Sequence, residues 1–263
     1  MPAAPVRVAL VQLEVTDAES VDDRLTRVVD LAREAAAGAD LVLLPEMWHV
    51  GAFAVDLAEK HAQGLGDEVV TALREVAEST ATWVHGGSFS EVTPDGRHFN
   101  TSVLVSPYGE IAETYRKVHL FGFDGGETTL MSSGERLVVT DSPLGPTGLA
   151  TCYDLRFPEM FRGLTELGAE SFLVPAGWPE RRIAHWTLLA RARAVENQAF
   201  VLACNGAGTH AGVPIGGRSL VVDPHGEVLA EAGTGEEVLV AEIDPDRVQA
   251  WRDAFPVLPD RRL

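Results

Sequence analysis

The chain has 263 residues, of which 46% are hydrophobic, so it is long enough to bury a large core. Its formal net charge of −18 comes from acidic residues scattered along the whole length, which argues against nucleic acid or an anionic membrane as a partner. No stretch approaches the ~20 apolar residues of a membrane span, and Arg7 interrupts the apolar run that a signal peptide would need. We therefore expect a cytoplasmic protein.

The first half of the chain predicts helices and strands in alternation. Apolar residues recur at helical spacing in two segments, and short apolar runs bounded by proline or glycine indicate strands between them. In chain order the predicted elements are a helix over 21–31, a buried strand at 39–45, a helix over 69–76, a strand at 83–87, and a hairpin over 102–112 with a Pro-x-Gly turn.

The second half repeats this order. The hairpin at 219–229 aligns with 102–112 without gaps, and the strand at 169–175 matches 39–45. The other predicted elements are a strand ending at 148–151, a helix with a stripe at Met160, Leu164 and Leu167, a helix with a stripe at Leu188, Leu189, Ala192 and Val195, and a strand at 201–205.

Two such halves most simply pack sheet on sheet with helices outside. The sequence thus predicts an α/β protein with a four-layer α-β-β-α sandwich and an internal pseudo-two-fold repeat. The segment 136–146 between the halves is a strand and a Pro/Gly turn, not a linker. We therefore expect one domain that spans residues 1–263.

Cys152 lies where an apolar strand stops and a helix is predicted to begin. Pro158 suits the first turn of that helix and Gly168 suits its end. The helix end and nearby cations lower the pKa of a cysteine on such a turn toward the reactive thiolate. Most free cysteines are nevertheless buried and inert, and Cys204, inside an apolar strand, is interpreted as core packing. The two cysteines form neither a disulfide framework nor a Cys-x-x-Cys metal site.

A nucleophilic cysteine needs a base and a group that stabilises the oxyanion. Histidine is the usual base, and His49, His119 and His185 are candidates, although lone histidines are more often structural. Glu46 is the better candidate because it follows a buried strand, where ligands collect in α/β sheets; a salt-bridged or capping glutamate is the alternative. Lys117, at another strand end, could place an ammonium over an oxyanion or could simply be solvated.

Glu46, Lys117 and Cys152, in this order and setting, make the chain resemble the nitrilase (carbon–nitrogen hydrolase) superfamily. The resemblance covers nearly the whole chain. The stretches that carry it are Leu-Leu-Pro-Glu at 43–46, Tyr-Arg-Lys-Val-His-Leu at 115–120, Thr-Cys-Tyr-Asp-Leu-Arg-Phe-Pro-Glu at 151–159, the segment 185–198 and the hairpin at 222–227.

The resemblance implies a Glu–Lys–Cys triad, with Glu46 as base, Lys117 as electrostatic stabiliser and Cys152 as nucleophile. Family members also carry a second glutamate in the loop after the lysine, and Glu127 falls at that position. The backbone N–H of Tyr153 would share the oxyanion with Lys117. No metal or organic cofactor is required, and the family's α-β-β-α sandwich agrees with the fold inferred from the repeat.

The motif after the nucleophile is similar to that of the ω-amidase-like branch. It implies a hydrolase of linear amides that releases ammonia from a small carboxylate-bearing amide, of the 2-oxoglutaramate or deaminated-glutathione type, through a thioester. Arg156 is a candidate to bind the carboxylate; an ion pair with Asp154 or Glu159 is the alternative. Phe53 and Trp178 could wall the pocket, although aromatic residues at strand ends are more often core.

Two other functions stay open at this point. Nitrile or N-carbamoyl-amine hydrolysis would use the same triad, and a non-catalytic binding protein is less favoured because the triad is intact. The resemblance also implies a homodimer or a higher homo-oligomer. Relatives often continue past the position of Arg262 into a tail that helps subunits pack, and this sequence ends at Leu263, so the oligomeric form stays open.

Overall fold

The computed structural model describes residues 4–122 and 125–262. In this part of the chain the main strands form two six-stranded sheets. The order in the first sheet is β14 (Glu237–Ile243), β1 (Val6–Gln12), β2 (Leu41–Leu43), β3 (Trp83–Val92), β4 (His98–Val105) and β5 (Ile111–Arg116). The order in the second sheet is β13 (Val228–Glu231), β12 (Leu220–Val222), β9 (Phe200–Asn205), β8 (Ser171–Ala176), β7 (Gly145–Leu149) and β6 (Val138–Ser142).

The two sheets share one topology, which confirms the internal repeat. In the first sheet β1, β2 and β3 are parallel and β4 and β5 continue antiparallel. In the second sheet β7, β8 and β9 are parallel and β12 and β13 continue antiparallel. The remaining edge strands are also equivalent, since β14 pairs antiparallel with β1 and β6 pairs antiparallel with β7.

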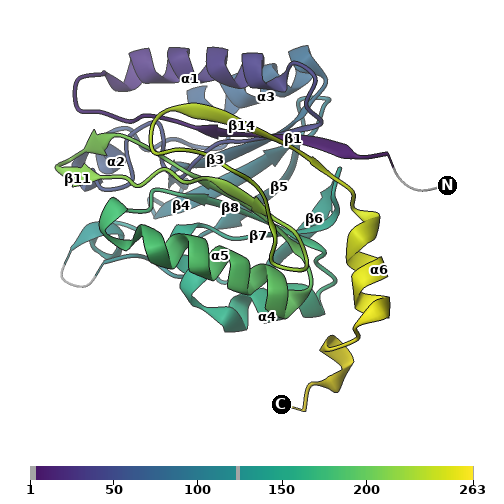
Figure 1. The fold of residues 1–263 in the computed structure, drawn as a ribbon. Helices are drawn as coiled ribbons and strands as arrows, with labels where there is room; N and C mark the ends of the chain where they lie inside the picture. The colour runs from purple at the N-terminus through teal and green to yellow at the C-terminus, as the bar shows by residue number, and fades with distance from the viewer. Residues whose placement is uncertain (1–3, 123–124, 263) are drawn as a thin grey trace.

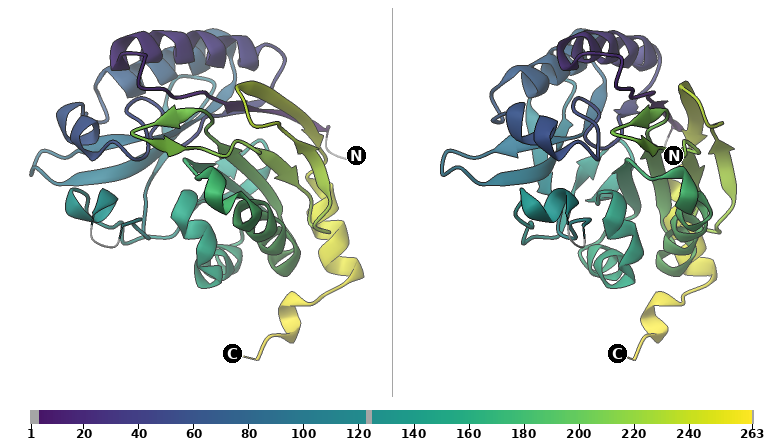
Figure 2. Two further views of the ribbon diagram at one scale, coloured as in Figure 1. Left: turned by 60° about the vertical axis from the view of Figure 1, so that its left-hand side comes forward. Right: turned by 90° about the vertical axis from the view of Figure 1, so that its left-hand side faces the viewer.

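Helices cover the outer faces of both sheets and complete the expected α-β-β-α sandwich (Figures 1 and 2). The α-helices are α1 (Val21–Ala36), α2 (Val55–Lys60), α3 (Glu68–Thr80), α4 (Pro158–Glu166), α5 (Ile183–Asn197) and α6 (Asp246–Ala254). Short elements are the 3-10 turns η1 (Gly126–Thr129), η2 (Cys152–Arg156), η3 (Glu180–Arg182) and η4 (Leu258–Asp260), and the hairpin of β10 (Thr209–His210) and β11 (Val213–Pro214). None of the helices in residues 4–122 and 125–262 is long and apolar enough to cross a membrane.

Strand β1 shows why the layers form. Val8 and Leu10 pack in one cluster with residues of the second sheet such as Leu202, whereas Ala9 and Val11 pack in a second cluster with α1 and α3. Successive side chains of a strand point to opposite faces, so a strand that is apolar on both faces must be covered on both. The other sheet covers one face of β1, and the helices cover its other face.

Helices α4 and α5 lie where the sequence predicted helices, but some of the residues predicted for their buried faces are exposed. Pro158 occupies the first turn of α4 as predicted, whereas Leu167 is 58% exposed. In α5 the predicted stripe is wrong at Leu188 and Val195, which are 65% and 50% exposed, whereas Leu189 packs against the core. The side chains of α5 that are buried are those of Trp186, Ala190, Arg193, Ala194 and Asn197. The small alanines let this helix lie close to the sheet, a geometry that a search for large apolar residues overlooks.

Candidate active site

One pocket of about 420 Å³ contains the predicted site residues. Glu46 follows β2 and Lys117 follows β5 of the first sheet, and Cys152 follows β7 of the second, so the carboxyl ends of strands from both sheets supply them. Ligands bind at such carboxyl ends in α/β sheets. The other candidates that line the same pocket are Phe53, Glu127, Tyr153, Arg156 and Trp178.

The Glu46 carboxylate is fixed through both of its oxygens. Oε1 accepts hydrogen bonds from Asn100 Nδ2 at 2.9 Å and from Lys117 Nζ at 2.6 Å, and Oε2 accepts one from the Gly177 N–H at 2.8 Å. The backbone before it is held by a close approach of β3, where a Cβ on Gly87 would lie 1.9 Å from a carbonyl oxygen. Only glycine permits that approach. The carboxylate therefore has one orientation, toward the pocket.

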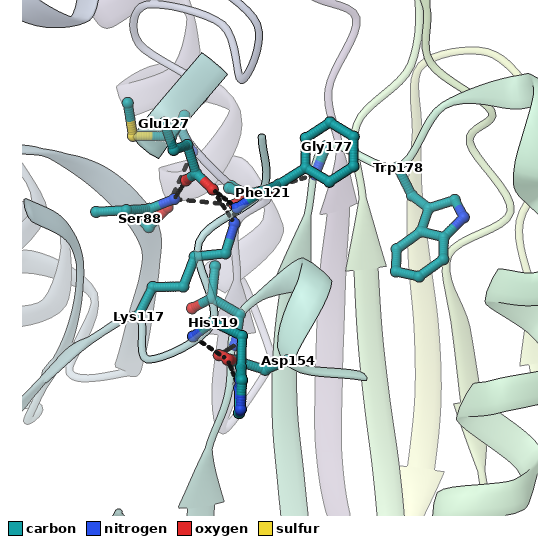
Figure 3. A network of polar contacts seen from close by, with 12 residues as sticks. Ser88, Lys117, His119, Phe121, Glu127, Asp154, Gly177 and Trp178 are labelled. Atoms are coloured by element: carbon teal, nitrogen blue, oxygen red, sulfur yellow. Dashed lines mark hydrogen bonds and ion pairs between the residues drawn. The ribbon is translucent and has the colours of Figure 1, made fainter. Parts of the chain in front are cut away.

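Lys117 lies between two carboxylates. Its Nζ is 2.6 Å from Glu46 Oε1 and 2.7 Å from Glu127 Oε2, and its side chain is buried (Figure 3). Burial alone would lower the pKa of Lys117, but the charges of Glu127 and Glu46 outweigh it and hold the pKa well above its ordinary value. Burial raises the pKa of Glu127; Lys117 opposes this and Glu46 reinforces it. The cluster thus presents a permanent ammonium beside two carboxyl groups.

Cys152 occupies a strained turn between β7 and η2. Its φ of 49° lies in the left-handed region, which residues with a side chain rarely adopt. A reciprocal capping box of Thr151 with Asp154 fixes the turn, and the Thr151 N–H donates to Asp154 Oδ2 at 2.8 Å. Such strain persists only where the surroundings hold it, and it clusters at functional sites. The turn places Cys152 at the pocket beside Glu46.

The predicted lowering of the Cys152 pKa is wrong. Burial raises the pKa of this thiol well above its ordinary value, and the Glu46 charge raises it further, whereas Lys117 opposes the rise. The segment that follows is the short 3-10 turn η2, and α4 begins only at Pro158, so no α-helix end lies at the thiol. The thiol is therefore protonated at neutral pH and needs a base to become a nucleophile.

No histidine lines this pocket in the described part of the chain. His119 stacks on Phe157 with 3.7 Å between ring centroids, and its Nδ1 is 2.8 Å from Asp154 Oδ1 (Figure 3). His49 is fully buried, which lowers its pKa to about 3, and His185 is exposed on α5. These positions favour the carboxylate of Glu46 over histidine as the base for Cys152.

Aromatic rings form one wall of the pocket. Phe121 packs edge-on against Phe53 at 6.0 Å and against Tyr153 at 5.3 Å between ring centroids. Trp178 lines the pocket as well, although it also belongs to the core between the layers. Apolar rings beside the thiol make its surroundings less polar than water, which strengthens electrostatic interactions there.

Arg156 lies against an aromatic ring. Its Cζ is 4.6 Å from the Trp178 ring centroid. Among the described residues it forms no ion pair with Asp154 or Glu159. The Asp154 carboxylate instead accepts hydrogen bonds from other groups, and the side chain of Glu159 is exposed. The alternative interpretation of Arg156 as a structural ion pair is therefore wrong.

Comparison with known proteins identifies the family. The model of the carbon-nitrogen hydrolase family matches residues 7–253. The chain belongs to this family. The 2-oxoglutaramate amidase of Paenarthrobacter nicotinovorans is 44% identical over 262 residues, which cover 97% of this chain and 89% of the relative. Omega-amidase NIT3 of Saccharomyces cerevisiae is 32% identical over 273 residues, which cover 98% of this chain and 94% of the relative.

Solved structures of carbon–nitrogen hydrolases confirm the predicted fold. Nit3 of Saccharomyces cerevisiae, a member of branch 10 of the nitrilase superfamily, superposes with a TM-score of 0.90 at 32% identity, covering 100% of this chain and 98% of that one. An amidase from Nesterenkonia sp. AN1 gives a TM-score of 0.84 at 28% identity, covering 98% and 94%. In that amidase the acetamide moiety of fluoroacetamide is covalently added at the active-site cysteine.

This carbon–nitrogen hydrolase has further pocket and supporting residues that the sequence analysis missed. Asn100 donates to both carboxyl groups of the cluster, and continuing the register of its hairpin would have placed it beside Lys117, whose N–H donates to the Asn100 carbonyl at 2.9 Å. Nothing in the sequence marks Asp154 as a supporting residue except its position two residues after the cysteine. Arg181 and Arg182 also line the pocket. The feature that could have pointed to them is a pair of basic residues between a predicted strand and a predicted helix in an otherwise acidic chain.

Proposed function

We propose that this hydrolase is a cysteine-dependent amidase that releases ammonia from a small carboxylate-bearing amide through a thioester, as an ω-amidase would. The observation that carries the proposal is the buried cluster in which Lys117 bridges Glu46 and Glu127 beside the protonated thiol of Cys152. The similarity to a 2-oxoglutaramate amidase and to ω-amidases supports this class of amide.

In the first half-reaction Glu46 removes the thiol proton while the sulfur of Cys152 attacks the amide carbon. The carbonyl oxygen becomes an oxyanion, and the Lys117 ammonium together with the backbone N–H of Tyr153 stabilises it. Glu46 then gives its proton to the departing nitrogen, which leaves as ammonia. The carbon–nitrogen bond is broken, and the acyl group remains on sulfur as a thioester.

In the second half-reaction the same carboxylate activates water. Glu46 takes a proton from the water as the water oxygen attacks the thioester carbon, and Lys117 again faces the oxyanion. Collapse breaks the carbon–sulfur bond, and Glu46 returns the proton to Cys152. Glu127 holds the ammonium of Lys117 in position through both steps, since its Oε2 is 2.7 Å from Nζ.

Ammonia release from ω-amides, uncharged amides, nitriles and N-carbamoyl amines tests the proposal. We expect release from carboxylate-bearing amides, with a fall of at least about 10⁴-fold in Cys152→Ala. Cys204→Ala is the matched control, because Cys204 is buried in β9 away from the pocket. Equal release by the wild type and Cys152→Ala would contradict the nucleophile. Carbon dioxide as a second product, or hydrolysis of nitriles only, would instead favour the two alternative reactions.

We also propose that residues 1–263 form one domain, supported by a family match that spans most of the chain, and that the protein forms a homo-oligomer. Exposed apolar residues on α5, Leu188 and Val195, support the second proposal. Two free cysteines are typical of a reducing compartment such as the cytoplasm. Light scattering of the purified protein tests the assembly, and a purely monomeric mass would contradict it.

A further inference from the structure

Three arginines line the same pocket as the Cys152 thiol. Arg156 belongs to η2, Arg182 belongs to η3, and Arg181 precedes Arg182. Among the described residues none of them forms an ion pair, although the sequence holds 39 acidic residues against 21 basic ones. Like charges gathered at one place repel one another unless an anion lies between them. The pocket therefore has the electrostatic character of an anion site.

The guanidinium groups are close enough to repel one another. Burial lowers the pKa of Arg182, and the charges of Arg181 and Arg156 lower it further. A negative charge on Cys152 or on Tyr153 would offset this effect. Arg182 lines the same pocket as the other two cations and the reacting sulfur, so an anion held by Arg182 would share the pocket with the thiol.

Aromatic rings hold two of the three guanidinium groups. The Cζ of Arg156 is 4.6 Å from the Trp178 ring centroid, and the Cζ of Arg182 is 5.2 Å from the Phe121 ring centroid. Both rings lie on the side of the site away from Ser88 (Figure 3). Stacking fixes the plane of a guanidinium and leaves its N–H edge for bidentate contact with a carboxylate.

The backbone also restrains Arg182, since its carbonyl oxygen accepts the indole N–H of Trp178 at 2.9 Å. Its side chain has no hydrogen-bond acceptor among residues 4–122 and 125–262. The side chain of Arg156 has only one contact of this kind, 3.5 Å from Nη1 to His185 Nδ1. Two guanidinium groups are thus held at the pocket, and apart from the contact of Arg156 with His185 the described residues leave their N–H groups without acceptors.

We infer that Arg182 and Arg156 form a two-guanidinium clamp for the substrate carboxylate, and that Arg182 determines the preference for carboxylate-bearing amides. The inference rests on the proposed function, in which the amide end of the same substrate is attacked by Cys152. Arg181 is exposed, so water screens its charge and its contribution is smaller.

The test compares two amides of the same length, glutaric acid monoamide and pentanamide, in which a methyl group replaces the carboxylate. The measured quantity is the ratio of kcat/KM for the acid to kcat/KM for the uncharged amide. Because hydrogen bonds to charged groups are strong, Arg182→Gln should lower this ratio by about tenfold or more, mainly through a higher KM for the acid. Arg156→Gln should lower it as well, and Arg182→Lys should recover part of the preference because it keeps the charge.

Arg33→Gln is the matched control. It makes the same change in net charge on the exposed surface of α1, where Arg33 pairs with Asp30. Its ratio should equal that of the wild type. A fall in Arg33→Gln as large as that in Arg182→Gln would mean that the overall charge, and not a clamp, sets the preference, and would overturn the inference.

A binding measurement separates this inference from the proposed function. Calorimetry with glutarate compares Cys152→Ala with the double variant Cys152→Ala/Arg182→Gln, and needs no turnover. If the wild type hydrolyses the acid but its preference survives in Arg182→Gln and Arg156→Gln, the clamp is wrong and the amidase function stands. If the wild type releases no ammonia from either amide, the function is wrong; weaker glutarate binding without Arg182 then still supports the clamp, and equal binding overturns it.

Discussion

Replacing Asn100 with leucine should shift the pH dependence of hydrolysis. The Asn100 amide donates to Glu46 Oε1 at 2.9 Å and to Glu127 Oε1 at 2.5 Å, and the residue is 1% exposed. Leucine has a similar volume but donates neither hydrogen bond. The ionised forms of the two carboxyl groups therefore lose stabilisation, whereas their protonated forms lose less.

The size of the shift follows from these two contacts. A hydrogen bond to a charged group contributes roughly 1.5–3 kcal/mol, and about 1.4 kcal/mol corresponds to one pH unit. The acid limb of kcat/KM should move to higher pH by about 1–2 units, because the proposed mechanism needs Glu127 ionised to hold the ammonium of Lys117. The pKa of Glu127, which burial already raises, should rise further for the same reason.

The assay is kcat/KM for a carboxylate-bearing amide from acid to neutral pH, with near-ultraviolet circular dichroism to confirm folding. Thr101→Val is the control from the same strand, since it removes the buried hydrogen bond of 2.6 Å to Glu91. It should lower stability without moving the acid limb. An acid limb that stays in place in folded Asn100→Leu protein would refute the role given to the amide.

Two further predictions concern the supports of the site. Asp154→Ala should lower Tm and reduce kcat, because alanine removes the Oδ2 atom that accepts from both the Thr151 N–H and the Tyr115 hydroxyl, at a cost of about 3 kcal/mol. Tyr115→Phe spares the bond to Thr151, and an equal loss of kcat there would contradict the capping role. Burial, reinforced by nearby cations, lowers the pKa of His49 to about 3, so its contribution to stability is complete above the unfolded pKa of about 6.5 and is lost by about 1.4 kcal/mol per pH unit as the pH falls toward 3. In His49→Phe the free energy of unfolding, measured with urea, should depend less on pH over that range. An unchanged dependence on pH would count against this role of His49.

The strand ends could be predicted from the sequence, and with them much of the site. Glu46, Lys117 and Cys152 each follow a strand that the sequence predicts, and the carboxyl ends of strands are where ligands collect in α/β sheets. The internal repeat of the sequence predicted the second sheet and the four-layer sandwich. The roles of these residues followed from the family resemblance, because the sequence pattern alone favoured a salt-bridged or capping role for Glu46 and left a solvated Lys117 open.

The rest depends on contacts that no local pattern records. The pKa of Cys152 rises because the folded chain buries the thiol and places Glu46 beside it, 106 residues away in the sequence. The true inner face of α5 includes Ala190 and Ala194, which periodicity underrates because alanine adds little apolar area. The pairing of Arg182 with Arg156 requires two separate 3-10 turns to meet at one pocket.

The proposed base and nucleophile come from different halves of the sandwich, with consequences for the interface between the sheets. Glu46 follows a strand of the first sheet and Cys152 a strand of the second, so neither sheet alone holds the reacting pair. Cys204 of β9 lies at that interface, and its Sγ is 3.3 Å from the Leu43 carbonyl oxygen of β2 in the other sheet. A bulkier residue there would push apart the two sheets, and a misplacement of about 1 Å can reduce a rate by about 10²-fold. We therefore expect a bulkier side chain at position 204 to lower kcat, although this position does not line the pocket.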